Sequence, residues 1–218
     1  MKEIRIGEQI WAGSNLSVTR FNNGDEIPLL DPKDFKQDWR FGKKWEKYSD
    51  DRKPVCALYK GEIVRKDSEG VLYNWYAAND DRGICPEGWT IPSIRDWIKL
   101  AQYLNGIEHL EKTEYQETRI FKGFTTQLKS RSGWDNNLNG TDDFDFNLQS
   151  LGRLGTLGDW KPAFGFTSMS FWTSSVYEPP YEQWVDTPFF VDDDMIINKG
   201  LTHAGFHVRC IRSETSEK

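Results

Sequence analysis

The most regular spacing of apolar and polar positions predicts a helix in the middle of the chain. Ser93, followed three residues later by Asp96, forms a capping box in which two free backbone N–H groups are satisfied reciprocally. Gly106 is typical of the position just after a helix. We therefore expect a helix from Ser93 to about Asn105. The apolar residues at helical spacing are Ile94, Trp97, Ile98, Ala101 and Leu104.

Shorter alternating runs predict strands on both sides of this helix. Residues 4–10 alternate around a turn, which predicts a β-hairpin whose second strand continues to Trp11. For residues 72–78, periodicity does not separate a buried strand from a turn of helix. The other predicted strands are residues 16–21, 55–59, 171–176, 183–185 and 206–211, with residues 189–191 and 196–197 on either side of an acidic turn.

Two polar segments, residues 31–53 and 105–122, interrupt these patterns, and both are interpreted as insertions. Residues 31–53 carry an aromatic side chain at about every third or fourth position, which predicts one or two helical pieces lying on the core. Residues 105–122 have the character of an insertion, in which the charged stretch 108–117 is expected to be helical or irregular. Residues 213–218 form a polar tail. Because no tandem repeat or linker separates these parts, we expect residues 1–218 to form a single domain.

Composition favours an irregular α+β or β fold over a helical bundle. Of the 218 residues 37% are hydrophobic and 14% aromatic, and ten are tryptophan, so aromatic rings must fill much of the core. A net charge of −6 argues against nucleic acid as the main partner. The sequence contains neither an apolar run long enough to span a membrane nor a signal peptide. The chain is therefore expected to be either cytosolic or the mature form of an exported protein.

The three cysteines, Cys56, Cys85 and Cys210, have no metal-ligand spacing, and the histidines are not grouped with them. They fit either one disulfide with a buried thiol or three free thiols.

Several separated motifs occur in one order along the chain. They are IGEQIW and VTRFNNGDEIP near the start, LYNWYAANDDRGICPEGWTIPS in the middle, then LKSRSGW, NGTDDFDFN, FWTSS and VRCIR. Over residues 6–212 this set resembles the Fibrobacter succinogenes major paralogous domain family. The chain departs from the family pattern at LQSLGR (residues 148–153), in the segment 105–122 and in lacking an export signal.

The resemblance implies a C-type-lectin-like fold. Such a fold is α+β, with an irregular antiparallel sheet, one main helix, one or two minor helices, long loops, and first and last strands that pair. The resemblance also implies a disulfide between Cys85 and Cys210, and an exported bacterial protein found extracellularly or at the cell surface. It implies no common activity.

One loop has the spacing of oxygen ligands in a calcium site. Hard oxygen donors alternate along such a loop, and Gly140 permits its sharp bend. Phe146 stands where a bidentate Glu is expected, and Asp142 or Asp145 would have to substitute for it. The alternative is a polar turn that binds nothing. The candidate ligands are Asp135, Asn137, Asn139, Thr141 and Asp143.

Other known chemistries fit less well. Glu178-Pro179-Pro180 and Trp184-Val185-Asp186 differ from the motifs of calcium-dependent lectins, and they lie too close together. The fold also resembles formylglycine-generating enzymes, but Cys210 is the only cysteine near the C-terminal end. A Ser/His/Asp arrangement with His203 or His207 stays open, although no nucleophile motif supports it. Within its predicted strand, His207 is expected to face solvent or to be a satisfied edge histidine.

Aromatic and acidic residues gather in the last third of the chain. Aromatic faces stack on sugar rings or anchor protein interfaces, and carboxylates accept hydrogen bonds nearby. Trp172 is expected to be core. The predicted ligand-binding residues are Tyr177, Tyr181, Trp184, Asp186, Asp192, Asp193 and Asp194.

These patterns favour a non-enzymatic binding or adhesion module that recognises glycan or protein through its C-terminal loops. The alternatives are an enzyme acting on polysaccharide and a structural surface protein without a ligand of its own. Calcium is the only cofactor that the sequence suggests.

Overall fold

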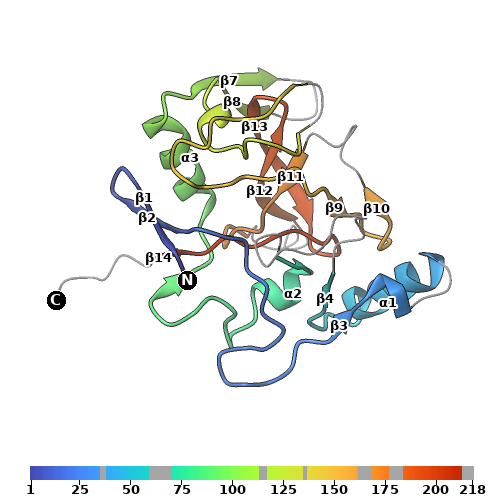
Figure 1. Ribbon diagram of the computed structural model, residues 1–218. Helices are drawn as coiled ribbons and strands as arrows, with labels where there is room; N and C mark the ends of the chain where they lie inside the picture. The colour runs from blue at the N-terminus through green and yellow to red at the C-terminus, as the bar shows by residue number, and fades with distance from the viewer. Residues whose placement is uncertain are drawn as a thin grey trace.

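The computed structural model describes residues 1–34, 38–58, 70–112, 117–134, 137–161, 168–176 and 184–212. These residues form an α+β arrangement in which most strand pairs are antiparallel. In Figure 1 the largest sheet and the central helix α3 (Ile94–Tyr103) occupy the upper part, and α1 (Asp38–Asp50) lies at the lower right. None of the helices described is long and apolar enough to span a membrane.

The two ends of the described chain meet in one sheet of order β1-β2-β14-β6. The predicted N-terminal hairpin is confirmed, and Ile211 in the last strand pairs with both Trp11 and Thr90. The N-terminus therefore lies beside β14 (Figure 1). The strands are β1 (Glu3–Ile6), β2 (Gln9–Ala12), β14 (Ile211–Arg212) and β6 (Trp89–Thr90).

The predicted central helix is confirmed as α3, including its capping box. Ser93 Oγ accepts the N–H of Asp96, and the Asp96 side chain accepts the N–H of Ser93 at 2.7 Å. The apolar face buries Trp97, whose ring lies 4.6 Å from that of Trp11 and 5.0 Å from that of Phe171 between centroids. This face fixes α3 against the largest sheet.

The largest sheet has the order β11-β12-β13-β8-β7, and it corrects one expectation. Residues 108–117 are not helical or irregular where the structure describes them, because β7 and β8 form a hairpin. Pairing with β13 buries Ile120 and Phe121, and this tertiary pairing outweighs the charged composition of the segment. The strands are β7 (Ile107–Lys112), β8 (Glu117–Lys122), β11 (Ser168–Ser170), β12 (Trp184–Val191) and β13 (Asp194–Leu201).

A smaller sheet and two helices form the remaining core. The helical expectation for residues 31–53 is confirmed by a 3₁₀ turn and α1, and residues 72–78 divide into a strand and a short helix. The elements are η1 (Pro32–Asp34), β3 (Leu29–Leu30), β4 (Cys56–Ala57), β5 (Leu72–Tyr73) and α2 (Trp75–Ala78). The rest are η2 (Thr125–Gln127), β9 (Arg153–Leu154) and β10 (Trp160–Lys161).

Three predicted strands are wrong in part or in whole. Residues 16–21 form no strand, because their backbone groups bind separate partners, such as Val208 and Asp25. Residues 171–176 make only single bridges at their two ends. In residues 206–211 the alternating sequence pattern does not reflect alternating exposure, since all six side chains are buried. Of these residues, Ile211 alone belongs to a strand, β14. A segment covered on both faces carries no reliable alternating pattern.

The disulfide implied by the family resemblance is present. Cys85 and Cys210 are bonded, while Cys56 is a free buried thiol whose pKa burial raises to about 12. The disulfide joins the loop ahead of α3 to the chain just before β14. Trp172 is fully buried, as expected, and its Nε1 donates to the carbonyl of Tyr73 at 2.6 Å.

Candidate functional site: the His203 cleft

A cleft of about 490 Å³ opens between the end of α1, α2 and the turn after β13. We call it the His203 cleft. Its volume lies within the usual range for small-molecule sites. Its lining residues are Ser49, Asp50, Arg52, Trp75, Tyr76, Asn79, Thr202 and His203.

Buried tryptophans and backbone hydrogen bonds hold the three walls of the cleft together. Trp45 in α1 is fully buried, and its Nε1 donates to the carbonyl of His203 at 2.8 Å. The N–H of Trp75, the first residue of α2, donates to the carbonyl of Thr202 at 3.3 Å. Asn74 caps α2 by accepting the N–H of Ala77. The side chains of the cleft are therefore presented from a fixed frame.

A line of polar groups runs along the cleft. His203 Nε2 lies 3.3 Å from Asp50 Oδ1, and His203 Nδ1 lies 3.5 Å from the hydroxyl of Thr202. That hydroxyl is 3.4 Å from the hydroxyl of Tyr76. The rings of Tyr76 and His203 meet edge to face, with centroids 6.3 Å apart. The cleft thus combines an aromatic edge with donors and acceptors of hydrogen bonds.

Ser49 adds a polar group that its surroundings leave unsatisfied. The residue is fully buried, and its hydroxyl has no hydrogen-bond partner among the described residues. Such a group is costly unless water or a ligand completes it. Charge of both signs is also available, since Asp50 and Arg52 line the same cleft. This mixture suits a ligand that offers many hydroxyl groups to the cleft.

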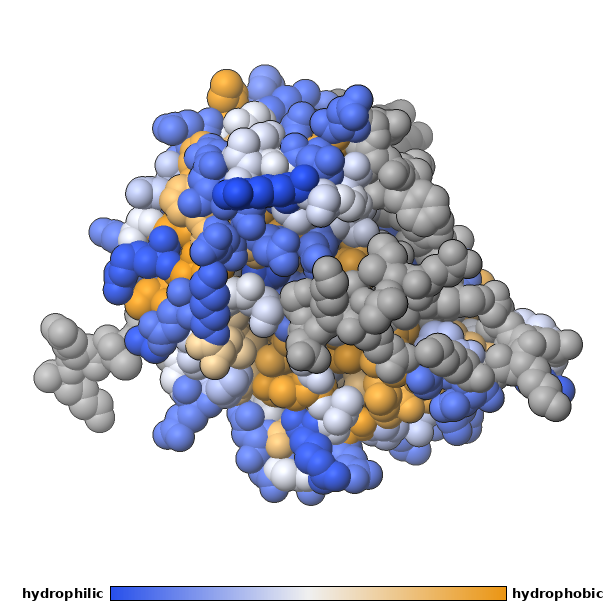
Figure 2. Space-filling view, in the orientation of Figure 1, coloured by the Kyte–Doolittle hydropathy of each residue, from blue (hydrophilic) through white to orange (hydrophobic). Residues whose placement is uncertain are grey.

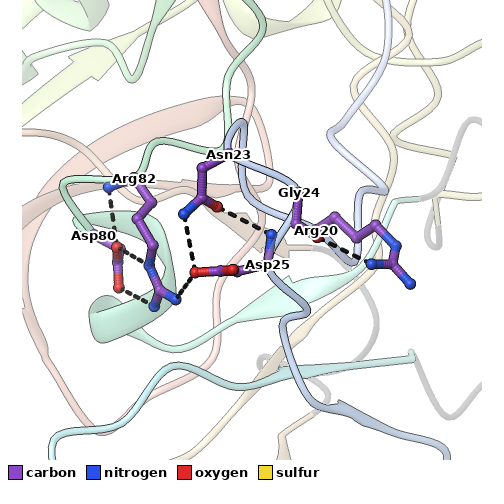
Figure 3. A network of polar contacts seen from close by, with 6 residues as sticks. All are labelled: Arg20, Asn23, Gly24, Asp25, Asp80 and Arg82. Atoms are coloured by element: carbon purple, nitrogen blue, oxygen red, sulfur yellow. Dashed lines mark hydrogen bonds and ion pairs between the residues drawn. The ribbon is translucent and has the colours of Figure 1, made fainter.

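The loop that carries Asn79 is anchored by Arg82 (Figure 3). The guanidinium donates two hydrogen bonds of 2.8 Å to Asp80 and one of 2.9 Å to Asp25, and it lies over the ring of Phe21. The hydrogen bond from Arg82 lowers the pKa of both Asp25 and Asp80. These contacts tie the turn at residues 22–25 to the loop after α2.

Residues 4–212 match the sequence profile of the Fibrobacter succinogenes major domain. The chain belongs to this family. No curated protein and no solved structure shows a significant match to it. The family motifs contribute Trp75, Tyr76 and Asn79 to the His203 cleft. The other wall comes from α1, which lies in the segment interpreted as an insertion.

In this Fibrobacter succinogenes major domain, those predicted ligand-binding residues that the structure describes lie at the two ends of β12. Trp184 and Asp186 are half-buried at the start of β12, whereas the acidic turn follows its other end. The extended strand spans roughly 23 Å from Trp184 to Val191, and Asp192 follows beyond its end. Tyr177 and Tyr181 lie outside the described residues.

Within the acidic turn, Asp193 has a structural partner. Lys129 is buried, its Nζ lies 2.5 Å from Asp193 Oδ1, and it also donates to the carbonyl of Asp192 at 3.1 Å. The ammonium group sits 5.0 Å from the ring centroid of Trp134. Burial raises the pKa of Asp194. The acidic turn is therefore bound to the core through a buried lysine.

Several described residues of the candidate calcium loop make hydrogen bonds within the protein. Asn139 Oδ1 accepts the N–H of Trp134 at 3.0 Å, and the Thr141 hydroxyl lies 3.4 Å from the carbonyl of Thr126. Phe146 is fully buried in the core. No three His, Cys, Asp or Glu side chains converge in the part of the family domain that the structure describes. Asp135 lies outside that part, and Asn137 and Asp143 belong to the same loop. Calcium binding stays a prediction of the sequence.

The expectation for His207 is wrong. The side chain is fully buried, and neither ring nitrogen has a hydrogen-bond partner among the described residues. Burial, with a smaller contribution from Arg209, lowers its pKa to about 3. The sequence did not distinguish His203 from His207. In the structure, His203 is the histidine that contacts an aspartate, Asp50. No spacing in the sequence signals this pair, because Asp50 comes from a distant helix.

Proposed function

We propose that this protein is a non-enzymatic binding module of a bacterial surface or secreted protein, and that it recognises glycan through the His203 cleft. The proposal includes the C-type-lectin-like fold. It is supported by the pairing of β2 with β14 and by the disulfide that joins the loop before α3 to the last strand region. The observation that carries it is the line of Tyr76, Thr202, His203 and Asp50 along one cleft.

The chemistry of the cleft favours a sugar over a protein surface. Hydroxyl groups of a sugar both donate and accept hydrogen bonds, and the cleft offers both kinds of partner. The C–H face of a sugar ring packs on an aromatic side chain, and the ring of Tyr76 is half-buried at the cleft. A protein interface would need a broad surface, whereas this site is concave. On the face shown in Figure 2, hydrophilic residues cover most of the coloured upper part, and hydrophobic residues gather in the lower centre.

A glycan array tests the proposal. Wild type is compared with Tyr76→Phe, which removes a hydroxyl group from the cleft, and with His203→Gln, which replaces the imidazole by an amide of different geometry. The matched controls are Tyr103→Phe and His109→Gln, because both side chains are exposed and lie outside the cleft. We expect wild type and controls to bind the same glycan and the cleft variants to lose about tenfold or more in affinity. Equal binding by all five proteins would place the ligand elsewhere.

An enzyme acting on polysaccharide is the second candidate, and the contact between His203 and Asp50 is the observation that favours it. A histidine held by a carboxylate is a general acid or base in many active sites. Chromatography of a bound glycan after prolonged incubation separates the two functions. Intact glycan supports the binding module, and shortened products that disappear with His203→Gln support the enzyme.

A further inference from the structure

A second cleft, of about 330 Å³, lies between β9, the loop after it and the β12–β13 hairpin. We call it the Arg153 cleft. It is separate from the His203 cleft in its lining, since the two share no residue. Asn198 and Thr187 line it from the hairpin, and Phe206 lies on the apolar side.

Arg153 is a half-buried cation that pairs with no anion in the described part of the chain, and Asp159 and Lys199 also line its cleft. Its guanidinium takes part in no hydrogen bond or ion pair within the described residues, and its Cζ lies 5.3 Å from the ring centroid of Phe189. Burial lowers the pKa of Arg153. Arg209, the other buried arginine, is by contrast satisfied by Asn15 and by backbone carbonyls. The donors of Arg153 are therefore left for a ligand, and a carboxylate matches their planar fork.

The rest of the cleft indicates what should carry that carboxylate. Asn198 Oδ1 accepts the N–H of Lys199 at 2.8 Å, so its amide NH₂ remains a donor for a hydroxyl group. Leu201 and Phe206 supply an apolar wall, and Leu157, also in the lining, is 62% exposed. An inorganic anion would make no use of this wall. A sugar ring would, because one of its faces consists largely of C–H groups.

We propose that the Arg153 cleft binds the carboxylate of a hexuronic acid, with Arg153 as its anchor, so that the glycan recognised by this protein is acidic. The inference rests on the proposed glycan binding but uses a different cleft, so each can fail without the other.

Isothermal titration calorimetry with defined probes tests this inference. The probes are trigalacturonic acid, a glucuronic acid trisaccharide, their methyl esters and an acidic tripeptide. Wild type should bind at least one uronic acid roughly tenfold or more tightly than its ester, because the ester cannot form a charge-assisted pair. Arg153→Gln should remove this preference and Arg153→Lys should retain part of it. Arg5→Gln, an exposed arginine on β1, should leave it unchanged.

The comparison of acid with ester uses wild type alone, so it does not depend on the folding of a variant. Equal affinity for acid and ester, or binding of neither, would overturn the inference. It would also be overturned if the tripeptide bound as tightly as the uronic acids. None of these results would alter the response of the glycan array to Tyr76→Phe, which tests the other cleft.

Discussion

The buried guanidinium of Arg209 is bound by the side chain of Asn15, which lies 194 residues earlier in the chain. Its Nε and one terminal nitrogen donate to Asn15 Oδ1 at 3.0 and 2.6 Å, and the other terminal nitrogen donates to the carbonyls of Ala12 and Phe146. Burial lowers the pKa of Arg209 to about 9. A cation held by neutral groups in the core depends on every acceptor it has.

Replacing Asn15 by alanine should therefore destabilise the protein strongly. The change leaves two donors of a buried cation unsatisfied, and we expect a loss of about 2–4 kcal/mol in the free energy of unfolding. Urea denaturation measures it. Asn23→Ala, in an exposed turn, is the matched control and should cost less than about 1 kcal/mol. Equal losses for the two variants would contradict the structural role assigned to Asn15.

The disulfide should contribute a large share of the stability. Cys85 and Cys210 are 125 residues apart, and closing a loop of that size is worth about 4.7–5 kcal/mol in the chain-entropy model. The double variant Cys85→Ser, Cys210→Ser should have a free energy of unfolding lower by about this amount, as measured by urea denaturation. Cys56→Ser controls for the loss of a buried thiol, and only the double variant should become insensitive to reductant. A wild-type protein whose stability ignores reductant would refute this prediction.

His207 should make the protein less stable as the pH falls. Its pKa is about 3 when folded and near 6.5 when unfolded, so the unfolded state binds more protons between these values. Its contribution is fully present above pH 6.5 and declines by about 1.4 kcal/mol per pH unit below it. Chemical denaturation between pH 4.5 and 6.5 measures the slope.

His207→Leu should reduce that slope, whereas His109→Gln, at an exposed position, should not change it. Comparing each variant with wild type cancels the other titrating groups, such as Asp194, whose raised pKa acts in the opposite direction. Identical slopes in wild type and His207→Leu would show that His207 is not buried as a neutral ring.

The sequence predicted local elements better than contacts between distant segments, and particular residues explain why. Ser93, Asp96 and the apolar positions after them report local structure, so the helix could be predicted closely. Within residues 105–122, β7 and β8 pair with each other and β8 pairs with the edge of β13, a contact that no local pattern encodes. The contact between His203 and Asp50 likewise depends on how α1 docks on the rest of the chain. A single sequence does not indicate which distant segments contact each other.

We expect the acidic turn to stabilise the fold through the ion pair between Lys129 and Asp193. Replacing the two residues singly and together tests this. Asp193→Ala leaves the buried ammonium group of Lys129 without its anion. We expect the free energy of unfolding to fall by about 1–3 kcal/mol. This loss is smaller than for a fully buried pair, because the Asp193 side chain is 52% exposed. Lys129→Met with Asp193→Ala should recover part of this loss. Urea denaturation of both single variants and the double variant gives the coupling energy. Strict additivity would mean that the two residues do not interact.

The central claim is that the His203 cleft binds the ligand, and NMR titration tests it most directly. Wild-type protein labelled with ¹⁵N would be titrated with the strongest glycan from the array. We predict that the largest amide shifts lie at the cleft, among Asp50, Tyr76, Asn79 and His203. Large shifts confined to the amides of Trp184, Asp186 or the acidic turn, with the cleft unchanged, would contradict the claim.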